Sequence, residues 1–135
     1  MVLGAVLIFQ EFRESVGSGT GFSFMGLAGL GTLLVGIFAE NTIVAFHLVG
    51  AALPFLIGNL GMVILGYALD LPRALRAYTI LSGLLSLVAL ALFANHTYLG
   101  LGIGGMERLV AYPQTTWLIV FGIYMSKSRL AARRS

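Results

Sequence analysis

The chain has 135 residues, of which 59% are hydrophobic and 10% are charged, and its formal net charge is +3. This composition leaves too few polar residues to cover the surface of a soluble globule of this size. Cysteine is absent, which excludes disulfides, thiolate metal sites and cysteine nucleophiles. The length predicts a single domain, residues 1–135, without room for a soluble catalytic domain.

The few charged residues are separated by long apolar runs. Four charge-free intervals lie between Glu14 and Glu40, Glu40 and Asp70, Arg76 and Glu107, and Arg108 and Lys127. Each interval can hold the roughly 20 helical residues that cross a hydrocarbon layer ~30 Å thick. The sequence therefore predicts an all-α fold: a polytopic transmembrane helical bundle, integral to the cell membrane.

The apolar segment at residues 1–9 is long enough for about half a membrane crossing. It lacks the basic start and cleavage site of a signal peptide, so we expect a short or re-entrant helix, or the remnant of a longer span. Residues 10–21 contain charges and a Gly/Ser run, and predict a loop.

Four full spans are predicted after this loop, at about residues 22–38, 42–68, 73–93 and 107–125. With the short N-terminal helix, the bundle has four to five helices. Pro54 lies inside the second full span, where it removes a backbone hydrogen bond and predicts a kink. A glycine-rich connector, residues 95–105, precedes the last span.

The distribution of basic residues predicts the orientation. Arg73 and Arg76 lie in the loop between the second and third spans, and Lys127, Arg129, Arg133 and Arg134 follow the last span. Because cytoplasmic loops are enriched in Lys and Arg, this loop and the C-terminus are expected to be cytoplasmic. Residues 39–41 and 95–105 are then expected to face outward.

This topology gathers the unusual polar residues at the outer side of the membrane. They are Glu40, Asn41, His47, Asn95, His96, Glu107, Arg108 and Tyr112. Ionisable groups near the hydrocarbon boundary usually face the interior of a bundle or a wet cavity. We therefore expect these residues to line an outer-facing, ligand-binding polar pocket; no catalytic residues are assigned.

Several other roles for these residues stay open. Glu40, Glu107, His47 and His96 could bind zinc or iron, but none of them pair at helical i, i+3 or i, i+4 spacing, so neither a metal nor another cofactor is expected. His47 could simply donate a hydrogen bond to a neighbouring carbonyl or carboxylate. Arg108 could form an ion pair with Glu40 across the helix ends.

Small residues line one side of each of the first two full spans: Ala28, Thr32 and Gly36 in the first, and Gly50, Pro54, Gly58 and Gly61 in the second. Such faces let membrane helices approach closely. Trp117 and Tyr112 are expected to lie at the membrane interface, where amphipathic aromatic rings are enriched.

Two segments resemble a known family: residues 35–41 followed by His47, and residues 105–108 followed by Tyr112 and Trp117. The family consists of small bacterial and archaeal membrane proteins containing "domain of unknown function 998", distantly similar to the Frag1/DRAM/Sfk1 membrane proteins. The resemblance covers about residues 22–125. It implies the fold and the outer polar cluster, with no established activity. Relatives usually have about six spans, so an upstream helix is expected to be missing.

The main functional hypothesis is the binding of a lipid or small amphiphile in the outer pocket, or a role as a membrane-assembly component. One alternative is an intramembrane enzyme acting on lipid head groups, and another is a small transporter or channel subunit. The expected partners are membrane lipids and a second copy or another membrane protein. Nucleic acid is not an expected partner, because the basic tail directly follows a predicted span.

Overall fold

The structure is a computed structural model that describes residues 15–132, with side chains described through residue 128. Six helical elements form this part of the chain: α2 (Val16–Ile37), α3 (Val44–Ala52), the π-helical turn η1 (Leu53–Gly58), α4 (Asn59–Ala68), α5 (Arg73–Ala94) and α6 (Gly102–Ala132). The predicted helical bundle is confirmed for this range. The predicted N-terminal helix, residues 1–9, lies outside the described residues.

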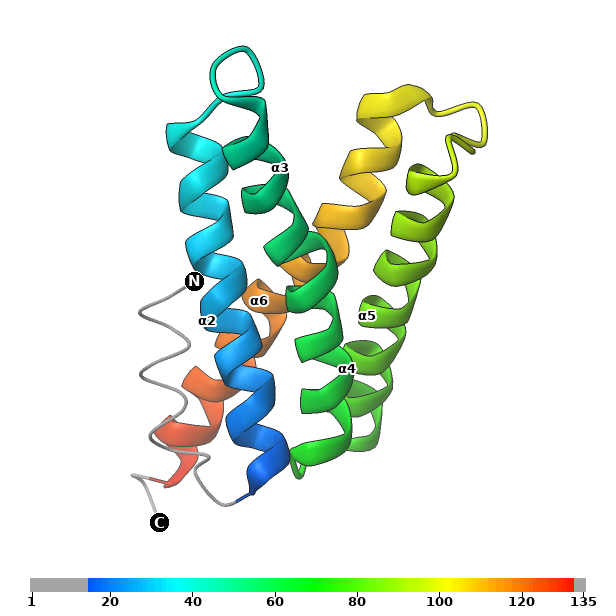
Figure 1. Ribbon diagram of the computed structural model, residues 1–135. Helices are drawn as coiled ribbons and strands as arrows, with labels where there is room; N and C mark the ends of the chain where they lie inside the picture. Colours follow the sequence, from blue (N-terminus) through cyan, green and yellow to red (C-terminus); the bar gives the residue numbers. More distant parts are fainter. Residues whose placement is uncertain (1–14, 133–135) are drawn as a thin grey trace.

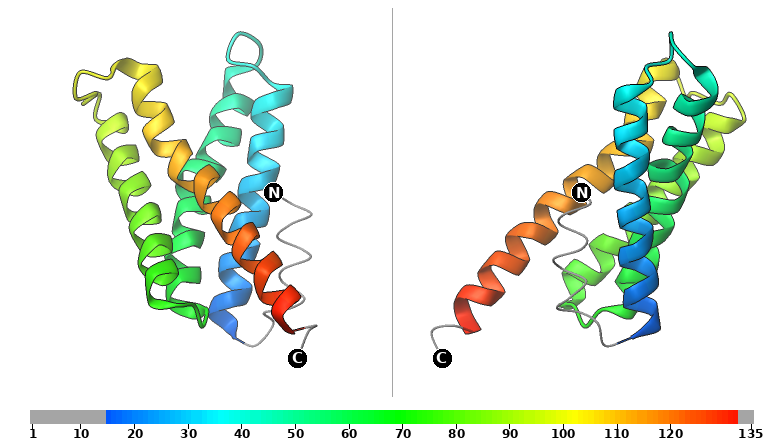
Figure 2. Two further views of the ribbon diagram at one scale, coloured as in Figure 1. Left: turned by 180° about the vertical axis from the view of Figure 1, so that it is seen from behind. Right: turned by 60° about the vertical axis from the view of Figure 1, so that its left-hand side comes forward.

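The helices run alternately up and down (Figure 1). The α2–α3 loop and the α5–α6 loop lie at the same end, which we call the two-loop end. The α4–α5 loop, the start of α2 and the end of α6 lie at the opposite end, here called the basic end because it carries Arg73, Arg76 and Lys127 (Figures 1 and 2). The two loops predicted to share one side of the membrane therefore do lie together.

The first described helix begins earlier than predicted. Ser15 is the N-cap of α2, and its hydroxyl accepts a hydrogen bond from the Ser18 amide at 3.1 Å. In return, the Ser15 amide donates to the Ser18 hydroxyl at 3.3 Å, which completes a capping box. The predicted loop over residues 10–21 is therefore wrong for residues 16–21, where small residues belong to a membrane-type helix.

The second predicted span is continuous but changes its hydrogen-bonding pattern at Pro54. The α-helix α3 passes into η1 and then into α4. Pro54 has no N–H to donate to the Gly50 carbonyl, and a π-helical turn accommodates the missing bond by shifting the pattern by one residue. The predicted kink is thus a π-helical turn, and it rotates the faces of α3 relative to those of α4.

The predicted third span agrees closely with α5, whereas α6 is longer than predicted at both ends. It begins five residues before Glu107, inside the predicted glycine-rich connector. Gly102 has a φ of +69°, which favours glycine at the start of this helix. In Figure 2, α6 is inclined to the other helices, and in the left-hand view it crosses in front of α4.

Within the described residues, three helices are long and apolar enough to cross a membrane: Val16–Ile37, Val44–Ala68 and Arg73–Ala94. Their outward faces expose large apolar side chains such as Leu30, Leu33 and Leu81. In α6 the apolar sequence is interrupted at residues 113–116 by Pro, Gln and two Thr, and this helix is not among the three. The predicted count of four full spans is therefore not confirmed.

Glycines bring α2 against α3 and α4. A Cβ atom added to Gly31 would lie 2.5 Å from the Gly50 carbonyl oxygen, and one added to Gly61 would lie 3.0 Å from the Gly21 carbonyl oxygen. The expected close packing is confirmed at Gly50, Gly58 and Gly61. It is wrong at Gly36, which is exposed and where an added Cβ atom would meet nothing within 4 Å.

The main core lies toward the basic end and joins α6 to the other helices. Its buried members are Phe22, Met25, Met62, Leu65, Leu69, Leu71, Trp117 and Phe121. Trp117 is 1% exposed, and its indole N–H donates to the Thr79 hydroxyl at 2.8 Å. The expectation that Trp117 lies at the membrane interface is therefore wrong, because the ring is a core residue.

Candidate functional site

A cleft with a volume of about 330 Å³ lies between α3–η1 and α6, which we call the α3–α6 cleft. Thr32 and Val35 of α2 contribute one wall. The other lining residues are His47, Ala51, Pro54 and Phe55 on one side and Glu107, Ala111, Gln114 and Thr115 on the other. Its volume lies at the low end of the range of ligand pockets.

Helical periodicity places the lining residues of each helix on one face of that helix. Positions 107, 111, 114 and 115 are separated by four, three and one residues, which keeps their side chains on one side of α6. Likewise, His47 and Ala51 are one turn apart on α3. The π-helical turn that follows presents both Pro54 and Phe55 to the same cleft.

The cleft extends from the two-loop end toward the middle of the bundle. Glu107 lies in the second turn of α6 and His47 in the first turn of α3. Gln114 lies seven residues further along α6, which at 1.5 Å per residue is about 10 Å deeper. The only formal carboxylate of the lining thus lies near the two-loop end, and apolar residues separate it from the deeper amide of Gln114.

His47 has a defined hydrogen bond. Its Nδ1 lies 2.9 Å from the carbonyl oxygen of Phe38, the C-cap residue of α2. Because a carbonyl can only accept, Nδ1 carries the proton, and in the neutral ring Nε2 is left as an acceptor. The predicted alternative, a hydrogen bond from His47 to a neighbouring carbonyl, is confirmed. The same half-buried side chain also lines the α3–α6 cleft.

Gln114 is a cleft residue that sequence reasoning missed. It is 4% exposed, and its amide nitrogen donates to the Met25 sulfur at 3.8 Å, a weak acceptor. A Cβ atom on Gly58 would collide with this amide, so the glycine provides the space that the side chain occupies. The signal lay in the spacing: Gln114 is seven residues, or two turns, after Glu107.

Behind the cleft, Asn59 connects η1 to α6. Its amide nitrogen donates to the Phe55 carbonyl at 2.8 Å and lies 3.5 Å from the Val110 carbonyl. Asn59 is fully buried, and its side-chain oxygen has no hydrogen-bond partner among the described residues. Asn59 therefore supports the wall of the cleft from the interior of the bundle.

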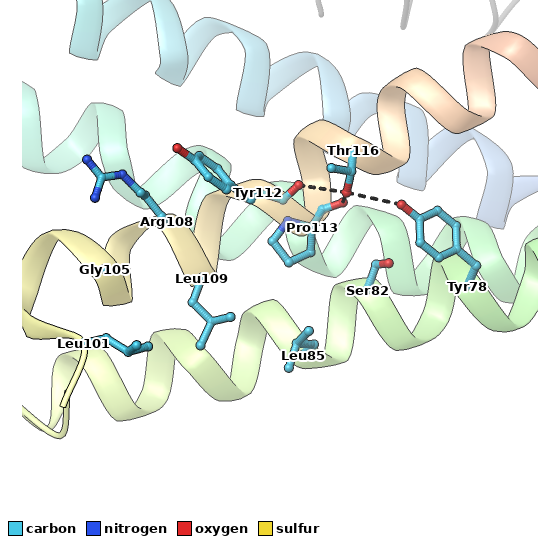
Figure 3. Close-up of a pocket in the computed structure, with 10 residues that line it drawn as sticks. All are labelled: Tyr78, Ser82, Leu85, Leu101, Gly105, Arg108, Leu109, Tyr112, Pro113 and Thr116. Carbon is cyan, nitrogen blue, oxygen red and sulfur yellow. Dashed lines mark hydrogen bonds between the residues drawn. The ribbon is translucent and has the colours of Figure 1, made fainter. Parts of the chain in front are cut away.

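A second depression, the α5–α6 groove, lies on the other side of α6 and has a volume of about 480 Å³ (Figure 3). Its lining includes Arg108 and Tyr112, two of the predicted pocket residues, which lie one turn apart. Consecutive helical residues are rotated by about 100°. Glu107 consequently lines the α3–α6 cleft, whereas Arg108 lines the α5–α6 groove.

The remaining predicted pocket residues lie in the two loops. Glu40 and Asn41 are exposed in the α2–α3 loop, and Asn95 and His96 are exposed in the α5–α6 loop. None of the four lines the cleft or the groove. His96 contacts Tyr98, whose hydroxyl lies 2.8 Å from Nδ1.

The anticipated ion pair between Glu40 and Arg108 is absent. Within residues 15–128, the sole ion pair joins Arg76 and Asp70 at the basic end, at 3.6 Å. Both side chains of that pair are exposed, so it contributes little to stability.

The four candidate metal ligands do not converge. No group of three or more His, Asp or Glu residues that could hold a metal ion occurs in the part of the chain that the structure describes. The geometry instead offers two kinds of non-metal recognition: hydrogen bonding beside a carboxylate in the cleft, and a guanidinium beside an apolar surface in the groove.

Comparisons with known proteins give a family. A search of curated proteins and a search of solved structures each found no match. The family model described as "Protein of unknown function (DUF998)" matches residues 1–124. That match does not test the likeness to the Frag1/DRAM/Sfk1 proteins, which stays a prediction. Because the model covers nearly the whole chain, the protein belongs to the DUF998 family.

Proposed function

We propose that this protein is a multi-pass membrane protein that binds the head group and upper chain of a lipid, or a small amphiphile, in the α3–α6 cleft. The observation that carries the proposal is the order of groups along the cleft. Glu107 and His47 lie near the two-loop end, and Ala51 and Ala111, each one helical turn deeper, provide apolar walls. This order follows that of an amphiphile inserted from the membrane surface.

The carboxylate defines the preferred head group. Glu107 can accept hydrogen bonds from an amine, and the Nε2 atom of His47 offers a second acceptor whenever the ring carries its single proton on Nδ1. An amine-bearing amphiphile therefore fits better than one with an anionic head group. Gln114, at the deep end, can donate its second amide hydrogen to a carbonyl such as an acyl ester.

The proposal includes membrane crossing by α6 as well as by the three more apolar helices. Its 31 residues would extend about 46 Å, which exceeds the hydrocarbon thickness and suits an inclined helix. Gln114 is buried against Met25, so the main polar side chain of its interrupted apolar sequence need not meet lipid. With four crossings, the basic end is cytoplasmic by the positive-inside bias.

Two neighbouring alanines give a matched test of the binding site. Ala51 lines the cleft, whereas Ala52 is exposed on the adjacent face of α3. Ala51→Phe should fill the cleft and reduce the amphiphile retained on purification, as counted by native mass spectrometry and identified after extraction. Ala52→Phe adds the same bulk and should retain it. Equal retention by the two variants would contradict the proposal.

A further inference from the structure

The α5–α6 groove differs chemically from the cleft that the proposed function uses. Arg108 and Tyr112 are one helical turn apart on α6, and in Figure 3 their polar ends lie on the same side of that helix. Leu85, Leu101 and Leu109 give the groove an apolar surface next to them. A cation and a phenol therefore border a surface that is otherwise suited to hydrocarbon.

Arg108 has no acidic partner within ion-pair distance among residues 15–128. At the basic end, in contrast, Arg76 is paired with Asp70. A guanidinium remains charged under all physiological conditions, and a charge close to the hydrocarbon is costly unless it is partnered. Arg108 is also the only Lys or Arg among the described residues at the two-loop end.

The chemistry of the missing partner follows from that of the guanidinium. Its planar set of N–H donors matches the oxygens of a phosphate, to which it can bind in a bidentate manner. The Tyr112 hydroxyl, from an exposed side chain one turn away, can donate a further hydrogen bond. The two groups together fit a phosphate at the end of the groove nearest the two-loop end.

The rest of the groove fits an acyl chain. Arg108 and Thr116 are eight residues apart, so the groove continues for about 12 Å toward the middle of the bundle. Two of its deep hydroxyl groups are already hydrogen-bonded, because Tyr78 donates to Thr116 at 3.2 Å and Thr116 in turn donates to a carbonyl of its own helix. Leu85 is 51% exposed and would face lipid.

We propose that the α5–α6 groove binds an anionic phospholipid, with its phosphate on Arg108 and Tyr112 and an acyl chain over Leu85 and Leu109. Free phosphate would leave the apolar surface uncovered, so the lipid is the occupant that accounts for both parts of the groove. This site is separate from the α3–α6 cleft, and its charge preference is opposite.

A variant of Arg108 provides the experiment. The full chain is placed in nanodiscs of phosphatidylcholine containing a minor fraction of phosphatidylglycerol, and the bound lipids are counted by native mass spectrometry. The wild type should retain phosphatidylglycerol preferentially. Arg108→Gln should lower that preference roughly tenfold, because it removes charge-assisted hydrogen bonds.

Two further variants keep the test decisive. Leu85→Trp fills the groove from its exposed side and leaves Arg108 in place, and it should also lower the preference for phosphatidylglycerol. This variant decides the test if Arg108→Gln proves unstable. Arg76→Gln removes a positive charge at the basic end and should have no effect. Unchanged preference in Arg108→Gln and Leu85→Trp would overturn the proposal. Displacement of phosphatidylglycerol by millimolar inorganic phosphate would also overturn it, in favour of a free-phosphate site.

Discussion

Individual side chains in this bundle serve either packing or recognition, and residue type alone does not separate the two roles. Trp117 is amphipathic, and such residues are common at membrane surfaces, yet here the ring is stacked on Phe121 in the core at a centroid distance of 4.9 Å. Its N–H donates to the hydroxyl of Thr79 on α5, which is 38 residues away in the sequence. Only the tertiary fold brings these two residues together.

The Trp117–Thr79 hydrogen bond gives a prediction at this scale. Thr79→Val preserves the shape of the side chain but leaves the buried indole N–H without its acceptor. We expect a loss of about 1 kcal/mol in the free energy of unfolding. The measurement is reversible denaturation in detergent micelles, followed by the fluorescence of this single tryptophan.

Thr20→Val is the matched control, because the Thr20 hydroxyl bonds only to the Val16 carbonyl of its own helix. Its effect should be close to zero. If both substitutions cost the same amount, the interhelical hydrogen bond would contribute nothing beyond the local one.

The candidate site could be predicted only in part at the residue scale. Ionisable residues in a hydrophobic chain are conspicuous, so Glu107, His47 and Arg108 could be singled out directly. Their division between two depressions could not, because it depends on the rotation of α6 against its neighbours. Gln114 escaped notice since an uncharged amide is not conspicuous in this way.

At the scale of the helices, the charge-free intervals predicted where helices lie, whereas the helix ends depended on local chemistry. The boundaries of α5 were predictable because Pro72 and Arg73 mark its start. The start of α2 was missed because Gly, Ser and Thr at residues 17–20 are typical of loops in soluble proteins. In a membrane helix the same small residues permit close packing, as Gly17 does against Ala68.

Two glycines of the predicted small-residue faces differ in their packing, and substituting each of them tests whether the packing matters for stability. Gly58→Ala would place a methyl group against the Gln114 amide and 2.8 Å from the Ala28 Cβ atom. We expect a destabilisation of about 1–3 kcal/mol, typical of overpacking. Melting in detergent, followed by circular dichroism, measures this cost.

Gly36→Ala is the control, because the added methyl group would meet nothing. Its melting temperature should be unchanged or raised, since alanine favours helix over glycine by up to about 1 kcal/mol. A loss of stability in Gly36→Ala as large as that in Gly58→Ala would show that the glycines have another role.

At the scale of the whole molecule, the bundle separates its charges between two ends. The basic end carries Arg73, Arg76 and Lys127, and the two-loop end carries Glu40, Glu107 and Arg108. The alternation of helix directions was predictable from the charge-free intervals and is visible in Figure 1. The inclination of α6, which forms both depressions, was not predictable because it results from packing around Trp117 and Phe121.

The proposed orientation can be tested on this cysteine-free chain. Single cysteines at Thr97, in the exposed α5–α6 loop, and at Ser135 should differ in their reaction with a membrane-impermeant maleimide applied to intact cells. Thr97→Cys should react and Ser135→Cys should react only after permeabilisation. The reverse pattern would invert the orientation, and equal reaction of both would contradict four crossings.

The central claim is that an amphiphile enters the α3–α6 cleft, and photolabelling tests it most directly. The full chain in nanodiscs would be exposed to a photoactivatable lipid that has an amine head group and a diazirine in its upper acyl chain. Peptide mapping should find adducts concentrated on cleft residues such as Phe55 and Ala111, and Ala51→Phe should lower their yield. Adducts spread evenly over lipid-facing residues such as Leu30 and Val49, and unaffected by Ala51→Phe, would contradict the account.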